Sequence, residues 1–200
     1  MKKIIAMLLA LTMLVAFAGC NNANAPETNA PETTAPVETT TAPTTEPAAT
    51  IASALEILET VWGQFGDDEK FFAMGGDFDN LVDGAPGKAS NTDFLTGNLI
   101  VPADQTANIT DAASLLHSMN ANTFTGAAYA VADVQAFANA MQTAIQGNHW
   151  MCGFPEKLVI AEVSGYVVVL FGHGDAVNPF LTKLTAAYPT TNVLVEEAIG

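Results

Sequence analysis

The chain of 200 residues contains no arginine, and lysine supplies all six of its basic side chains. Against 21 aspartates and glutamates, these lysines leave a formal charge of −15 at pH 7. Residues 51–200 hold 17 of the acids and four of the lysines, which gives that part a formal charge of −13. Such a surface repels phosphate backbones and anionic headgroups. The composition therefore argues against nucleic acid as a ligand and against electrostatic docking on a membrane.

Only one long apolar run is present, at residues 4–18, and it is short for a membrane-spanning helix. It follows Lys2 and Lys3, as the apolar region of a signal peptide follows its positive start. The run ends in Phe17-Ala18-Gly19-Cys20, which resembles the lipobox of bacterial lipoproteins. We expect residues 1–19 to be a cleaved signal peptide and Cys20 to carry palmitate or similar acyl chains, a durable membrane anchor. An ordinary secretory signal or an uncleaved anchor is the alternative.

Residues 21–50 lack Leu, Ile, Phe and Trp and consist largely of Thr, Pro, Glu, Ala and Asn. Such a tract cannot bury enough surface to offset the entropy of ordering it. Its prolines favour extended polyproline II, so about thirty residues reach on the order of 90 Å. Residues 20–50 are therefore expected to be a disordered tether after the lipidated cysteine.

Cysteine is scarce as well, because Cys152 is the only other one. With Cys20 acylated, no intrachain disulfide can form, so packing has to stabilise the fold. Residues 51–200 have the length of a single domain. We expect one acidic α+β domain there.

Apolar spacing predicts the elements of this domain. Helices are expected at 51–65, 110–119, 133–146 and 175–188, and strands at 124–131, 157–163, 166–171 and 192–195, with a further short strand near 99–101. The order from residue 123 to 196 is β-α-β-β-α-β, that of the ferredoxin-like unit. The rest of 67–108 shows no clear pattern.

In a ferredoxin-like unit, the first and third strands are central and the second and fourth lie at the edges. The run at 166–171 is apolar on both faces, as a central strand covered on both sides would be. Both helices of the unit cover the same face. We therefore expect the N-terminal helical extension, the segments up to 119, or a second copy of the chain to cover the other.

This topology brings three turns to one end of the sheet, at 119–122, 149–155 and 172–175. The side chains of His149, Cys152, His173 and Asp175 could then supply ligands for a zinc-like ion. Alternatively, Cys152 is a nucleophile whose thiolate is favoured by His149 or His173. His117 precedes the first turn and could join them. The favoured structural alternative makes Trp150, Met151, Cys152 and Phe154 a hydrophobic plug.

Acidic residues cluster at 67–69 and recur at Asp77, Asp79 and Asp83, which suggests calcium. The EF-hand pattern fails at Leu81, so solvated loop acids are the favoured interpretation. The HExxH, GxSxG and SxxK signatures of hydrolases are absent from the sequence.

The stretches Met119-Asn120-Ala121-Asn122-Thr123-Phe124-Thr125-Gly126 and His149-Trp150-Met151-Cys152-Gly153-Phe154-Pro155-Glu156-Lys157-Leu158 resemble an uncharacterised family of small lipoproteins from Gram-positive, clostridia-like bacteria. The similarity extends over roughly residues 110–200. The family has no assigned activity, so the resemblance implies no catalytic or binding role.

These observations favour a non-enzymatic, surface-displayed binding or interaction module. It would be lipid-anchored on the extracytoplasmic face of the cell membrane, with a cell-wall or envelope protein as partner and no cofactor. One alternative is a small metal-binding or Cys-dependent enzyme that uses His149, Cys152 and His173, with zinc or calcium as its ion. Another is an accessory subunit of a membrane complex, which docks by an uncovered apolar face of the sheet.

Overall fold

A computed structural model of the chain describes residues 50–200. The predicted signal peptide at 1–19, lipidation of Cys20 and the tether lie outside the described residues. Within 50–200, no helix combines the length and the apolar character needed to cross a membrane.

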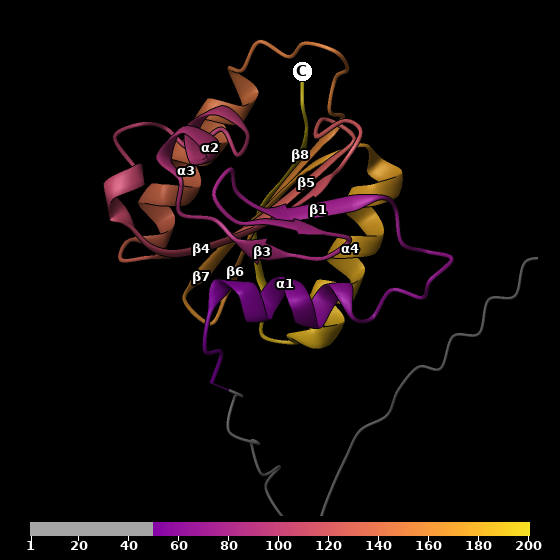
Figure 1. The fold of residues 1–200 in the computed structure, drawn as a ribbon. Helices are drawn as coiled ribbons and strands as arrows, with labels where there is room; N and C mark the ends of the chain where they lie inside the picture. The colour runs from indigo at the N-terminus through magenta and orange to yellow at the C-terminus, as the bar shows by residue number, and fades with distance from the viewer. Residues whose placement is uncertain (1–49) are drawn as a thin grey trace, which may run out of the picture. The chain divides into compact units, whose positions relative to one another are not determined.

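The described residues form an α+β domain around one eight-stranded sheet in which all neighbouring strands run antiparallel (Figure 1). In chain order, the elements are α1 (Ala54–Trp62), β1 (Ala73–Gly76), β2 (Leu81–Asp83), β3 (Gly87–Lys88), α2 (Thr92–Gly97), the 3-10 turn η1 (Thr106–Asn108), β4 (Ile109–His117), β5 (Phe124–Val131), α3 (Val134–Gln146), β6 (Lys157–Val163), β7 (Tyr166–Gly172), α4 (Gly174–Ala187) and β8 (Asn192–Ala198). Across the sheet the order is β2-β1-β4-β5-β7-β6-β8, and β3 pairs with β4 beside β1.

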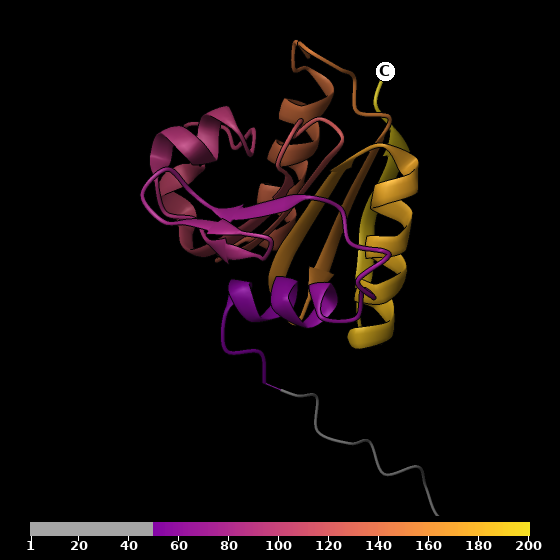
Figure 2. The same cartoon turned by 45° about the vertical axis from the view of Figure 1, so that its right-hand side comes forward.

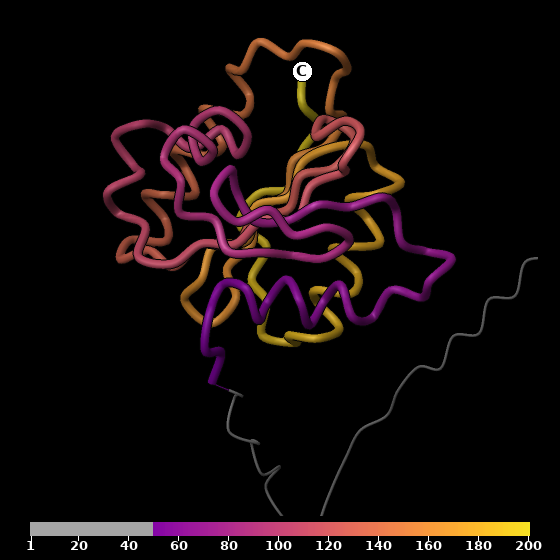
Figure 3. The backbone as a smooth tube through the Cα atoms, in the orientation of Figure 1, coloured from indigo at the N-terminus to yellow at the C-terminus, as the bar shows by residue number. Residues whose placement is uncertain are grey.

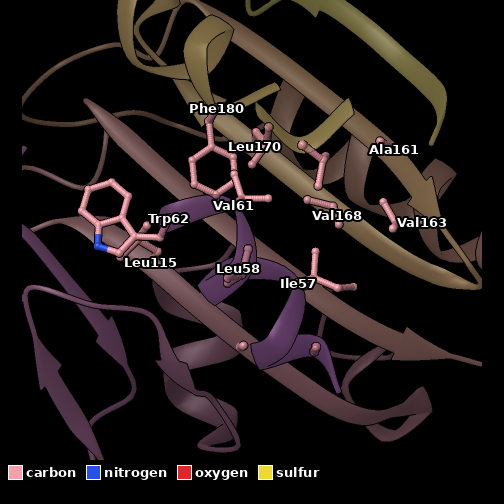
Figure 4. Close-up of a cluster of buried hydrophobic side chains, with 14 of the residues drawn as sticks. Ile57, Leu58, Val61, Trp62, Leu115, Ala161, Val163, Val168, Leu170 and Phe180 are labelled. Carbon is pink, nitrogen blue, oxygen red and sulfur yellow. The ribbon is translucent and has the colours of Figure 1, made fainter. Parts of the chain in front are cut away.

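Helices cover both faces of this sheet (Figure 2). One hydrophobic core joins the sheet to α1 and α4, through residues such as Leu58, Trp62 and Phe180 (Figure 4). A second core joins the opposite face to α2 and α3, through Phe94, Phe137 and Met141. An uncovered apolar sheet face, which the accessory-subunit alternative requires, is therefore not found in the described domain.

The expected β-α-β-β-α-β order of the C-terminal part is confirmed, but its ferredoxin-like strand pairing is not. A ferredoxin-like unit would pair β8 with β5, whereas β8 pairs with β6 and β4 takes the free edge of β5. As a result, β6 is internal rather than an edge strand. The two crossover connections, β5–α3–β6 and β7–α4–β8, then lead toward the same edge of the sheet, although β5 and β7 run in opposite directions. Because such crossovers are right-handed, α3 and α4 fall on opposite faces.

The helix predicted at 110–119 is wrong, because these residues form strand β4. Its apolar residues are buried on both faces of the sheet, which removes the alternation that would distinguish a strand from a helix. The presumed cap residue Asp111 serves another helix instead. Its carboxylate accepts a hydrogen bond of 2.8 Å from the backbone N–H of Ala54, the first residue of α1.

The strand predicted near 99–101 is also wrong. Leu99 and Val101 are buried there, but the backbone of Ile100 has a left-handed φ of 57° and belongs to no strand. The patternless region instead forms β1, β2, β3, α2 and η1. These elements are too short for sequence periodicity to identify.

Candidate functional site

Three segments meet at one end of the sheet: the turn at 118–123, the loop at 147–156 and the segment 172–175. The backbone N–H of Glu156 donates to the carbonyl of Gly172 at 2.9 Å, and that of His173 donates to the carbonyl of Thr123, also at 2.9 Å. The predicted juxtaposition of the segments near 150 and 173 is therefore confirmed. We call this region the loop end; the indigo segment that includes α1 lies at the opposite end of the domain (Figure 3).

Two asparagines from the 118–123 turn hold the 147–156 loop. The side-chain amide of Asn120 donates to the carbonyl of Cys152 at 2.7 Å. That of Asn122 donates to the carbonyls of Met151 at 2.8 Å and Gly153 at 3.0 Å. These bonds stabilise a sharp bend, in which Cys152 and Gly153 have φ values of 63° and 133°. The sequence places both asparagines in the turn but gives no sign of what they bind.

The candidate ligands at this end do not converge on one point. His149 is exposed beside a cavity of about 290 Å³ on the side of α2, whereas Asp175 lines a different cavity next to α4. Cys152 is exposed, and His173 is half-buried just before α4. Residues 50–200 contain no group of three or more His, Cys, Asp or Glu side chains that could hold a metal. The zinc and thiolate hypotheses gain no geometric support.

Asp77, one of the acidic residues proposed for calcium, is engaged in hydrogen bonds within the domain. Asp77 is fully buried and accepts hydrogen bonds from the backbone N–H groups of Asp79, Asn80, Ser90 and Asn91. Burial by itself would raise the pKa of Asp77, but these four donors lower it to about 2. Asp77 therefore organises the loops that connect β1, β2 and α2.

The predicted hydrophobic plug is largely wrong. Trp150 packs against Phe171, with ring centroids 5.4 Å apart, but Met151, Cys152 and Phe154 are exposed. Met151 and Phe154 are joined at the loop end by Phe72 and Met119, and all four apolar side chains are between 73% and 81% exposed. The segments that carry Phe72 and Met119 are in contact, since Ser118 donates to the carbonyl of Phe72 at 2.7 Å. Because these side chains come from three segments at the same end of the sheet, this end is a candidate interaction surface.

A cavity of about 400 Å³ opens beside these residues on the face of α1 and α4. Its lining combines aromatic rings with two carboxylates and consists of Phe65, Glu69, Phe71, His117, Thr123, Asp175, Ala176 and Pro179. We call it the His117 pocket. The imidazole of His117 stacks on Phe71, with centroids 5.4 Å apart and an interplanar angle of 19°. Phe71 lies in the region that sequence patterns leave unassigned, so this stack was missed.

The two carboxylates of the His117 pocket differ in their surroundings. Glu69 accepts hydrogen bonds from the backbone N–H of Gly66 and from Lys183, and these bonds lower its pKa. The ammonium of Lys183 also lies 4.6 Å from the centroid of the Phe65 ring. Asp175 is exposed, and neither of the two ion pairs found within residues 50–200 includes it.

The imidazole of His117 is also held by the backbone. Its Nδ1 accepts a hydrogen bond of 3.3 Å from the backbone N–H of Met119. With Nδ1 acting as acceptor, a neutral imidazole carries its proton on Nε2. The His117 pocket thus combines flat aromatic faces with a carboxylate, that of Asp175, which belongs to neither ion pair of the described residues.

A somewhat larger cavity, of about 440 Å³, lies between β3, β4 and α2. Its lining includes Lys88, Ser90, Thr92 and Thr110 but no aromatic residue, and it is remote from the loop end. It therefore lacks the flat apolar surfaces that bind most organic ligands.

Comparison with protein-family models, with characterised proteins and with solved structures found no match. The assignment of a function therefore depends on the geometry of the loop end and on the sequence of the N-terminal segment.

Proposed function

We propose that this chain is a lipid-anchored, extracytoplasmic binding module that uses the loop end to bind a protein of the cell envelope. The observation that carries the proposal is the set of four exposed apolar side chains, Phe72, Met119, Met151 and Phe154, at one end of the sheet. The indigo segment before α1, through which the chain leaves the domain toward the proposed anchor, lies at the other end (Figure 1). A partner could therefore approach the loop end without meeting the membrane-proximal part of the chain.

Three features of the sequence support the location. The lipobox-like stretch that ends in Cys20 supplies an anchor, residues 21–50 supply reach, and the formal charge of −13 within 51–200 keeps the domain from adhering to anionic headgroups. The chain would belong with the Gram-positive lipoproteins that it resembles. Asn120 and Asn122 support the binding role, because a loop held in one conformation loses less entropy on binding.

Replacement of Cys20 by alanine tests the anchor. We expect the variant to move from the membrane fraction to the culture medium and to lose incorporation of labelled palmitate. Retention of the C20A chain on membranes in full amount would contradict lipidation at this residue.

The binding role is tested by the double variant Met151→Ser/Phe154→Ser. We expect this variant of the full chain to lose most of its binding to purified cell-envelope protein from the producing bacterium, because the exposed apolar contacts are gone. Leu81→Ser is the matched control: Leu81 is 65% exposed, but it lies on the edge strand β2. Equal loss in both variants, or in neither, would contradict a specific role for the loop end.

A further inference from the structure

We infer that the His117 pocket receives an arginine side chain of the partner protein. The inference rests on the proposed function, because it names the chemistry by which the loop end would recognise that partner. It follows from the charge of the His117 pocket, from the flat rings that line it and from a cation already bound to its lining.

The charge of the His117 pocket favours a cationic ligand. Asp175 contributes an exposed carboxylate and belongs to neither ion pair of the described domain. Lys183 contacts the lining of this pocket, but its ammonium is already bound to the carboxylate of Glu69 at 3.1 Å and to the backbone carbonyl of Gln64, also at 3.1 Å. Lys70 lies over the ring of Trp62 instead. The Asp175 carboxylate therefore keeps a negative charge that a cationic ligand would neutralise.

The cation already bound to the pocket lining indicates how such a ligand binds. The ammonium of Lys183 lies over the Phe65 ring at 4.6 Å and contacts the carboxylate of Glu69. The same lining contains a second ring surface and a second carboxylate, the Phe71–His117 stack and Asp175, and neither ion pair of residues 50–200 includes Asp175. The pocket lining thus includes one ring and carboxylate that already bind a cation, Phe65 and Glu69, and a further ring surface and carboxylate for which we propose a cationic ligand.

The flat stack favours a guanidinium over an ammonium. A guanidinium is planar, stacks on aromatic rings and pairs with a carboxylate through two parallel N–H groups, whereas an ammonium does neither. Its aliphatic stem would contact Ala176 and Pro179, which supply the aliphatic part of the lining. Residues on either side of the arginine would then meet exposed Phe72 and Met119.

The sequence itself limits the choice of occupant. Because the chain contains no arginine, neither one of its own segments nor a second copy can fill the site with a guanidinium. The occupant has to come from another molecule, and the apolar side chains around the opening favour a peptide segment over a free amino acid.

The test uses ¹H–¹⁵N NMR of the full chain in nonionic detergent with two capped peptides, acetyl-Leu-Arg-Leu-amide and the same peptide with citrulline. Citrulline has nearly the shape of arginine but no charge. We expect the arginine peptide to shift the backbone amides of Thr123, Asp175 and Ala176. The citrulline peptide should bind about tenfold or more weakly, as expected when a hydrogen-bonded charge is lost. Equal binding of the two peptides would overturn the inference.

Asp175→Asn should reduce the affinity for the arginine peptide by about tenfold or more. Asp93→Asn is the matched control, because Asp93 is an exposed acid in the first turn of another helix, α2, outside the His117 pocket. Unchanged affinity in D175N would overturn the inference. Free L-arginine that binds as tightly as the peptide would overturn the assignment to a protein partner.

Binding to cell-envelope protein separates this inference from the proposed function. If only D175N keeps full binding to envelope protein, the arginine site fails while the proposed function stands. If Met151→Ser/Phe154→Ser keeps full binding to envelope protein, the proposed function itself fails.

Discussion

Among the described residues, Asp77 is the acidic side chain with no exposed surface, and backbone N–H groups from two separate loops donate to its two oxygens. A carboxylate in this position replaces the water that those N–H groups would otherwise bind. At the scale of a single residue, it fixes the start of α2 relative to the β1–β2 turn. An acid that the sequence suggested as a calcium ligand is therefore a structural residue.

The pH dependence of unfolding should report this role. Because the pKa of Asp77 is about 2 in the folded chain and ordinarily 3.8, its stabilisation is complete above about pH 4 and is lost as the pH falls toward 2. The expected contribution is on the order of 2 kcal/mol. Urea unfolding of the full chain, followed by circular dichroism across this range, should show the drop. Asp77→Asn should unfold more easily at pH 7 and should show a smaller drop, whereas an identical pH profile would contradict the assignment.

Gly172 also acts at the residue scale, because it lies where β7 leaves the sheet at the loop end. Its φ is 149°, and a Cβ on it would lie 2.3 Å from the carbonyl oxygen of Thr123. Gly172→Ala should lower the free energy of unfolding by about 1–3 kcal/mol. Gly97→Ala is the control, since a Cβ there meets nothing within 4 Å and should be neutral or slightly stabilising. Comparable destabilisation by both substitutions would argue against a close approach at Gly172.

At the scale of elements, the sequence predicts strands well where β-branched residues are concentrated. The Tyr166–Phe171 run and its hairpin with 157–163 are confirmed, as is the Asp133-capped helix α3. Strand β4 was mistaken for a helix because alanines and leucines buried on both faces show no period of two. The position of β8 could not be predicted either. It depends on β4 occupying the edge of β5, which no local pattern in β8 records.

The loop end could nevertheless be predicted, although the order of strands was wrong. The directions of the strands decide at which end of a sheet each turn lies. The predicted directions were correct, although the predicted order was not. What lies in the turns was harder to predict. The hydrogen bonds of Asn120 and Asn122 join residues about thirty positions apart, and the Phe71–His117 stack involves a residue outside any recognisable element.

The asparagine contacts lead to a prediction for the 147–156 loop as an element. Asn122→Ala removes the hydrogen bonds to the carbonyls of Met151 and Gly153, so the loop should open locally while both cores stay intact. Hydrogen–deuterium exchange should show faster exchange in 148–154 and unchanged exchange in β5 and β7. Asn139→Ala is the control, because Asn139 lies on the exposed side of α3. Exchange that speeds up throughout the sheet would indicate a global role for Asn122 instead.

At the scale of the whole molecule, electrostatic repulsion opposes folding, because 17 acids face four lysines within residues 51–200. Raising NaCl from about 0.01 M to about 1 M shortens the Debye length from about 30 Å to about 3 Å. We expect calorimetry of the full chain at pH 7 to show a higher Tm at high salt, by roughly 2–4 °C for each kcal/mol of repulsion removed. A Tm that stays constant or falls would show that the acids are too widely spaced to interact.

The position of Gly200 affects how the protein can be labelled. The backbone N–H of Ile199 donates to the carbonyl of Glu156 at 3.0 Å, and that of Gly200 donates to the side chain of Gln146 at 3.4 Å. An affinity tag or fluorescent protein fused after Gly200 would therefore sit next to the 147–156 loop and could block access to it. Reporters inserted just before Thr50 would leave that access clear, so pull-downs with the two arrangements should recover different amounts of any protein captured there.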